Sequence, residues 1–182
     1  MTLVTNPIAL AALARAQQAA RIGPPPRART DSRTADKFVI RGYAELFTEL
    51  NGIGLHQGRS SNSEMVAAIL DALSGHQRSN ALLHILKSHI GESIAERVLT
   101  ELPDFDLGAC KTPQKFVIRF PMQVRDAIRD GVATAIASEQ STGPYSMNGW
   151  VLNALVGWVK FQRQQYALLS AAMAMDQTLL GG

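Results

Sequence analysis

The chain has 182 residues, of which 46% are hydrophobic and 6% aromatic, enough apolar material for one or two domains with a buried core. Its single cysteine, Cys110, excludes an internal disulfide, and neither Cys110 nor the four histidines have the spacing of a metal site. No apolar run approaches the ~18 residues of a membrane span, and residues 1–20 lack the basic start of a signal peptide. We therefore expect a cytoplasmic protein that binds no cofactor and does not enter a membrane.

The positive charge is concentrated near the N-terminus. The formal net charge is +3, but residues 1–41 contain seven Lys or Arg and two acids, a net +5, whereas the rest of the chain has a net −2. Such an asymmetry is typical of a basic arm that contacts a polyanion. A solubilising tail is the alternative interpretation.

Residues 1–35 are predicted to form this arm. Asn6 followed by Pro7 is a helix-start pattern, and residues 8–22 are rich in the helix formers Ala, Leu and Gln. A Gly-Pro-Pro-Pro sequence ends this helix, and residues 27–35, which contain no large apolar side chain, are predicted to be a linker.

The sequence KFVIR occurs twice, at residues 37–41 and again at residues 115–119. In each copy the first, third and fifth side chains share one face and the aromatic and isoleucine side chains share the other, which indicates a half-buried strand. The two strands predict an antiparallel ribbon with one cationic and one apolar face. A two-stranded ribbon fits the major groove of B-DNA. The apolar face would consist of Phe38, Ile40, Phe116 and Ile118.

Two helices are predicted after the first strand. The first is expected to begin at Gly42 and to end in a turn over residues 51–58. Ser60 or Ser61 is the expected N-cap of the second helix, with Glu64 in capping-box register to Ser61. The resulting order is strand, helix, turn, helix.

This order, with the sequence GRSSNSE at residues 58–64, resembles the ribbon-helix-helix family and its Arc-repressor branch in particular. In that branch a short strand ends in Arg, and a Gly-Arg-Ser-x-Asn-Ser-Glu sequence begins the second helix. The interval from Arg41 to Asn62 also agrees with the spacing of the family. The resemblance covers about 40 residues in each copy.

The second copy is more divergent. Pro-Gln precedes its strand and Phe-Pro follows it, a frame that is even more similar to Arc. Ser146 is the expected N-cap of its second helix, and Ser146-Met147-Asn148 aligns with Ser60-Ser61-Asn62, although the interval from strand to helix is eight residues longer. The apolar stripe of its first helix is predicted to be Val124, Ile128, Val132 and Ile136.

The copies differ from Arc at a buried Arg–Glu–Arg triad, which hydrophobic residues can replace without loss of the fold. The first copy retains Arg59 and Glu64 but has Ala68 at the third position. The second copy has only uncharged residues there, namely Tyr145, Trp150 and Ala154. We therefore expect the fold to be retained with different packing in the two copies.

The predicted fold class is mainly α with one short two-stranded antiparallel β-ribbon. It is a tandem ribbon-helix-helix pseudo-dimer with a helical connector and a long, apolar C-terminal helix that packs on the connector or contacts another protein. Pairing of each copy with its twin in a second chain, giving a homo-oligomer, is the alternative. The domain boundaries are an arm at 1–35, copies at 36–75 and 112–160, the connector at 76–111 and the C-terminal extension at 161–182.

The resemblance implies contacts with double-stranded DNA. Outward-facing strand side chains would contact base edges, and the N-termini of the second helices would bind phosphates. The base-contacting residues would be Lys37, Val39, Arg41, Lys115, Val117 and Arg119. The phosphate-binding residues would be Ser60, Ser61, Asn62, Ser146, Met147 and Asn148, with Arg27, Arg29 and Arg33 from the arm. Ordinary strand cations and plain helix caps are the alternative interpretation.

No nucleophile–base arrangement, phosphate loop or carboxylate pair indicates an enzyme. The leading hypothesis is a sequence-specific DNA-binding protein that acts as a phage or plasmid transcriptional repressor. A relaxosome accessory protein similar to TraY, which binds DNA near a transfer origin, is the closest alternative. Two other hypotheses are an antitoxin-like protein whose C-terminal helix binds a partner and a structural protein that no longer binds DNA.

Overall fold

The computed structural model describes residues 36–120, 122–137 and 146–180. The arm helix over residues 8–22, the arm arginines, Pro121, the turn at 141–144 and Tyr145 lie outside the described residues. The chain divides into the unit Met1–Thr34 and the unit Ala35–Gly182, and all the described residues belong to the second unit.

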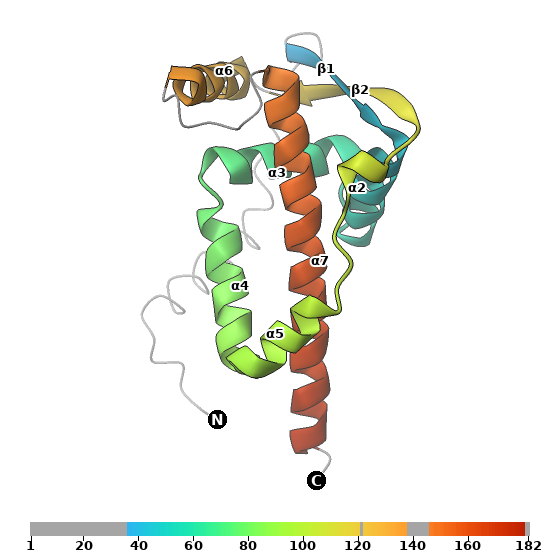
Figure 1. Cartoon of the computed structure of the whole chain (residues 1–182), viewed down its shortest axis with the longest axis vertical. Coiled ribbons are helices and arrows are strands. Elements are labelled where there is room, and N and C mark those ends of the chain that lie inside the picture. The colour runs from blue at the N-terminus through green and yellow to red at the C-terminus, as the bar shows by residue number, and fades with distance from the viewer. Residues whose placement is uncertain (1–35, 121, 138–145, 181–182) are drawn as a thin grey trace, which may run out of the picture. The chain divides into compact units, whose positions relative to one another are not determined.

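The fold is mainly helical with one two-stranded antiparallel sheet, which confirms the predicted fold class (Figure 1). The elements are, in chain order, β1 (Asp36–Tyr43), α2 (Ala44–His56), α3 (Ser61–Leu73), α4 (Gln77–Ile90), α5 (Glu92–Thr100), a short 3₁₀ turn η1 (Leu107–Ala109), β2 (Pro113–Phe120), α6 (Met122–Ala137) and α7 (Met147–Leu180).

The two copies of KFVIR pair with each other in one chain. Val39 lies opposite Val117 at the centre of the register, and the ladder continues outward to Tyr43 opposite Pro113. Each strand therefore has eight residues instead of five. The prediction that Gly42 opens a helix was wrong, because cross-strand pairing keeps Gly42 and Tyr43 extended and α2 begins at Ala44.

The core lies beneath the ribbon. Ile40 and Ile118 are fully buried, and Phe38 and Phe116 are partly buried against the same cluster, as the alternation predicted. The helices below contribute the remaining apolar residues, and their burial supplies the main driving force for this arrangement. These residues include Leu46, Leu50, Met65, Ile69, Ile128, Val132, Val151, Leu155 and Val159.

Helix α2 continues to His56, so the prediction of a turn over residues 51–58 was also wrong. Gly54, within this stretch, does not turn the chain; its missing side chain lets α2 pack closely against Arg59 and Glu64. A Cβ at Gly54 would lie 3.1 Å from the carbonyl oxygen of Arg59 and 3.4 Å from Cβ of Glu64. The connection to α3 is left to residues 57–60, where Gly58 has a φ of +67° that favours glycine.

The connector contains two helices, separated at Gly91, whose φ is +86°. Helix α7 has 34 residues, and α4 lies beside it while α5 crosses its second half (Figure 1). A second cluster formed by Ile90, Ala95, Leu168 and Ala172 joins these three helices. The second half of α7 thus packs on the connector. None of the described helices, α7 included, has the length and hydropathy that a membrane crossing needs.

Candidate nucleic-acid interface

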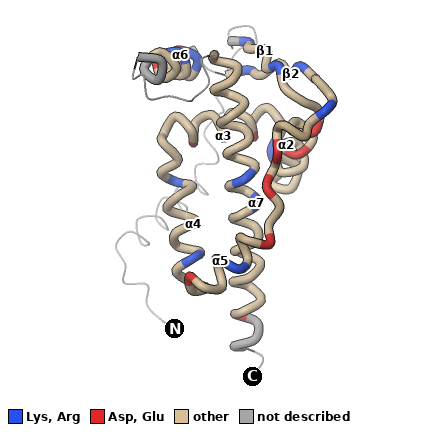
Figure 2. Tube along the Cα trace, in the orientation of Figure 1, with Lys and Arg blue, Asp and Glu red and all other residues tan. Residues whose placement is uncertain are grey.

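The outward face of the ribbon carries the six side chains that the sequence predicted. Val39 and Val117 are 45% and 50% exposed, which is unusual for valines in a chain with an ample core. The four flanking cations are exposed as well, and Figure 2 shows Lys and Arg along both strands. The structure therefore brings together Lys37, Val39, Arg41, Lys115, Val117 and Arg119, because directly opposite residues of an antiparallel pair share a face.

The register orders this face into three rungs. Lys37 lies opposite Arg119, the two valines form the middle rung, and Arg41 lies opposite Lys115. None of the four cations forms an ion pair with a carboxylate of the described residues. The face consequently presents one Lys and one Arg on each side of an apolar centre, an arrangement suited to a polyanionic ligand.

Helices α3 and α7 begin with the same capping geometry. The Ser63 N–H donates to Oγ of Ser60 at 3.2 Å, and the Gly149 N–H donates to Oγ of Ser146 at 3.0 Å. Ser60, and not Ser61, is therefore the N-cap of α3, and the expected capping box between Ser61 and Glu64 was wrong. The caps leave the first backbone N–H groups of both helices without a partner inside the helix.

Each of the two helix N-termini is bonded to one strand of the ribbon, α3 to β2 and α7 to β1. The side chain of Asn62, on α3, accepts a hydrogen bond from the Arg119 N–H at 2.8 Å and donates to the Arg119 carbonyl oxygen at 3.1 Å. Asn148, on α7, does the same with Arg41, at 2.8 and 3.0 Å. Because Arg119 and Arg41 lie on the two outer rungs of the ribbon face, these pairs place one helix N-terminus toward each end of the ribbon.

The polar side chains at the starts of α3 and α7 are already engaged within the protein. The amides of Asn62 and Asn148 bond the strands, and the Ser61 hydroxyl donates to Oδ1 of Asn51 at 2.6 Å. What remains for an anion is the set of backbone N–H groups at Ser61, Asn62, Met147 and Asn148. Such N–H groups, together with the positive end of the helix dipole, form a ready anion site.

The first turn of α3 contains a buried carboxylate, that of Glu64. Glu64 has no exposed surface; its Oε1 accepts a hydrogen bond from Nε1 of Trp158 at 2.6 Å, and its Oε2 lies 3.0 Å from Nε of Arg59. The Arg59 contact is an ion pair without the alignment of a hydrogen bond. The sequence places Ala68 at the third position of this group and gives no sign of Trp158, because Trp158 is 94 residues from Glu64.

The entry to β2 is fixed by a second carboxylate. Oε1 of Glu45, in the first turn of α2, accepts hydrogen bonds from the N–H groups of Lys111 and Thr112 at 3.0 and 3.2 Å. The Lys111 bond is the main reason that the pKa of Glu45 lies below its ordinary value of 4.5. Since the Ala44 N–H also donates to the Thr112 carbonyl oxygen, at 2.8 Å, the start of α2 anchors the segment that leads into β2.

Comparison with known protein families agrees with this geometry. Residues 32–79, which include β1, α2 and α3, match the family model described as an Arc-like DNA binding domain. No curated protein and no solved structure matches the chain significantly. Over these residues the chain is therefore similar to the ribbon-helix-helix domains of the Arc type, a class that binds DNA sequence-specifically and typically as a dimer.

Proposed function

We propose that the chain is a sequence-specific double-stranded DNA-binding protein whose ribbon enters the major groove. The observation that carries the proposal is the exposed face of three rungs, with a helix N-terminus beside each end. Arg and Lys side chains can donate to the O6 and N7 atoms of guanine, and the valines can pack on thymine methyl groups. The backbone N–H groups of α3 and α7 would bind phosphates on the two sides of the ribbon.

We further propose that β2, α6 and the first half of α7 form a second ribbon-helix-helix unit. Three observations support this: the repeated strand sequence, the matching caps at Ser60 and Ser146, and the reciprocal asparagine contacts. One chain would then supply both strands of the ribbon, and the operator would have two related half-sites. The dimeric arrangement of the class would be built into a monomer.

The pairing within one chain can be tested by cross-linking. In a Cys110→Ala background, Val39→Cys/Val117→Cys places two thiols directly opposite each other in one chain. Oxidation should give a monomer on a non-reducing gel, and Val39→Cys alone should give no cross-linked dimer. A dimer from the single variant would show that β1 pairs with its twin in a second chain and would contradict the tandem proposal.

The biological role that we propose is transcriptional repression on a phage or plasmid, as the resemblance to the Arc branch implies. A relaxosome accessory protein at a transfer origin is the second candidate, favoured by the presence of both strands in one chain. Both roles need sequence-specific binding. The position of the selected site would distinguish them, because a repressor site lies in a promoter and a relaxosome site lies beside a nicking site.

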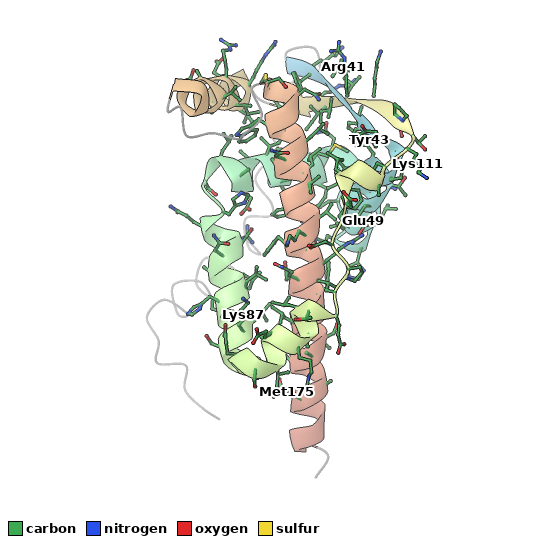
Figure 3. All side chains as sticks on the ribbon, in the orientation of Figure 1. Arg41, Tyr43, Glu49, Lys87, Lys111 and Met175 are labelled. Carbon is green, nitrogen blue, oxygen red and sulfur yellow. The ribbon has the colours of Figure 1, made fainter. Side chains whose placement is uncertain are left out.

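DNA binding is tested by selection from random duplexes and sequencing, at several salt concentrations. Wild type should enrich a short motif that Arg41→Ala/Arg119→Ala loses, because each good base contact contributes about 1–3 kcal/mol of discrimination. Lys87→Ala/Arg97→Ala is the matched control, since it removes two cations far from the ribbon, where Figure 3 labels Lys87. Equal, weak binding by all three proteins without an enriched motif would contradict the proposed function.

A further inference from the structure

A cavity of about 530 Å³ lies between α3, α4 and α7. This volume is in the range of small-molecule sites. The apolar side chains in its lining include Leu70, Leu82, Trp158 and Phe161. Leu70 is 48% exposed although it lines the cavity, so a bound apolar group would cover surface that is now open to water.

The polar part of the lining carries more positive than negative charge. Arg59, from the connection before α3, and Arg78, from α4, contribute two guanidinium groups. The carboxylate is Asp71, whose Oδ2 is already bonded to Nδ1 of His76 at 2.9 Å. Arg59 directs its Nε at Glu64, and Arg78 forms no ion pair with any described carboxylate. The cations that line the cavity are thus incompletely neutralised.

The polar wall on the α7 side is fixed. Gln162 is 2% exposed, and its Oε1 accepts a hydrogen bond from Nε2 of Gln57 at 2.8 Å, while the same nitrogen donates to the Tyr166 hydroxyl at 3.0 Å. A site with preformed polar groups loses little entropy when a ligand binds. Next to these polar groups, the ring centroids of Trp158 and Phe161 are 5.2 Å apart, a spacing typical of an aromatic pair.

We propose that this cavity binds a small organic anion with a flat aromatic body, an aromatic carboxylate in chemical class. The carboxylate would bond the guanidinium of Arg78 and the open side of Arg59, because a planar guanidinium matches a carboxylate in two parallel hydrogen bonds. The aromatic body would pack on Trp158 and Phe161. The cavity adjoins the candidate DNA interface, because Arg59 pairs with Glu64 and Glu64 lies two residues after Asn62, which bonds the ribbon. Binding of the anion does not depend on DNA binding.

The test uses 1-naphthoate as probe and the two indole N–H signals in ¹H–¹⁵N spectra of the full chain, assigned with Trp150→Phe. The Trp158 signal should shift in a saturable manner while the Trp150 signal stays in place. The neutral analogue 1-naphthalenemethanol should bind at least fivefold more weakly. Arg78→Gln should weaken naphthoate binding at least fivefold, Ala67→Leu should weaken it by filling the cavity, and Arg97→Gln on α5 should leave it unchanged.

Three results would overturn the proposal: no saturable shift of the Trp158 signal, equal affinity for the acid and the alcohol, or equal binding by Arg78→Gln and wild type. Ligand binding is measured without DNA, so this outcome is separate from that of the DNA selection. A chain that selects no DNA motif and still binds naphthoate at Trp158 would contradict the proposed function alone.

Discussion

In the half formed by β1, α2 and α3, the fourth residue after the helix cap is the fully buried Glu64, bonded to Trp158 and paired with Arg59. At the matching place in the half formed by β2, α6 and α7 stands Trp150, partly buried in the apolar cluster. At the ribbon the two halves make the same asparagine contacts. The surface that faces the ribbon is therefore alike in the two halves, whereas the packing beneath it is polar in one and apolar in the other.

This difference shows which contacts the architecture requires. Both halves need a capped helix whose asparagine bonds the opposite strand, because exposed strand backbone groups must find partners. A buried ion is not required, since apolar side chains can fill the same position at similar or greater stability. The indole donor for Glu64 comes from α7, so the polar group of one half depends on the other half.

Trp158→Phe is expected to have the largest effect. The change removes the indole donor from a buried carboxylate and leaves it with Arg59 alone, so the free energy of unfolding should fall by about 2–3 kcal/mol in urea denaturation. Adding Glu64→Leu should recover most of the loss, because an apolar side chain needs no donor. Trp150→Phe is the control in the other half and should lower the free energy of unfolding by less than Trp158→Phe does. A double variant as unstable as Trp158→Phe would show that the hydrogen bond is not the cause.

Asn62→Ala and Asn148→Ala compare the contacts that the halves share. Each change removes two hydrogen bonds between a side chain and the opposite strand, so each should lower the free energy of unfolding by about 1–2 kcal/mol. Amide hydrogen exchange locates the effect: Asn62→Ala should speed exchange at Arg119 and Asn148→Ala at Arg41. Faster exchange at both amides in both variants would instead indicate that the ribbon opens as one unit.

Ser61→Asp tests the anion site at the start of α3. A negative charge there favours the helix dipole but repels phosphate, so the affinity for the selected DNA should fall about tenfold without a loss of thermal stability relative to Ser61→Asn. The asparagine variant is the matched neutral control. Equal DNA affinity of the two variants would show that no phosphate lies at this helix end, and the N-terminus of α7 would remain as the candidate phosphate site.

Glu45→Gln should have the smallest effect, and this effect should be present near neutral pH and absent in acid. Because the folded-state pKa of Glu45 lies below the ordinary value of 4.5, its carboxylate contributes stability that is complete above that value and is lost as the pH falls through the lowered pKa. Melting temperatures should therefore differ between wild type and Glu45→Gln near neutral pH and converge in acid. Glu96→Gln, on α5, is the control and should follow wild type throughout. A difference that persists at low pH would assign the effect to altered packing.

Most of the secondary structure around the ribbon could be predicted from short stretches of sequence. The strict alternation in KFVIR fixed which faces of β1 and β2 are buried, and Ser146 was recognisable as a cap. The errors occurred where tertiary contacts outweigh local preference. Gly54 suggested a turn, but it lies inside α2 because its missing side chain makes room for the backbone of Arg59. Gly42 suggested a helix start, but pairing with Gln114 keeps it in the strand.

By itself, the sequence determined the repeated strand, the exposed cationic face, the capped helices and the resemblance to the Arc branch. All of these depend on residues within a few positions of each other, where periodicity and capping rules apply. The bonds of Asn62 to Arg119, of Glu64 to Trp158 and of Gln57 to Gln162 were decided only by the tertiary structure, because these residues are 57, 94 and 105 positions apart. The cavity between α3, α4 and α7 arises in the same way, since helix packing brings its lining together.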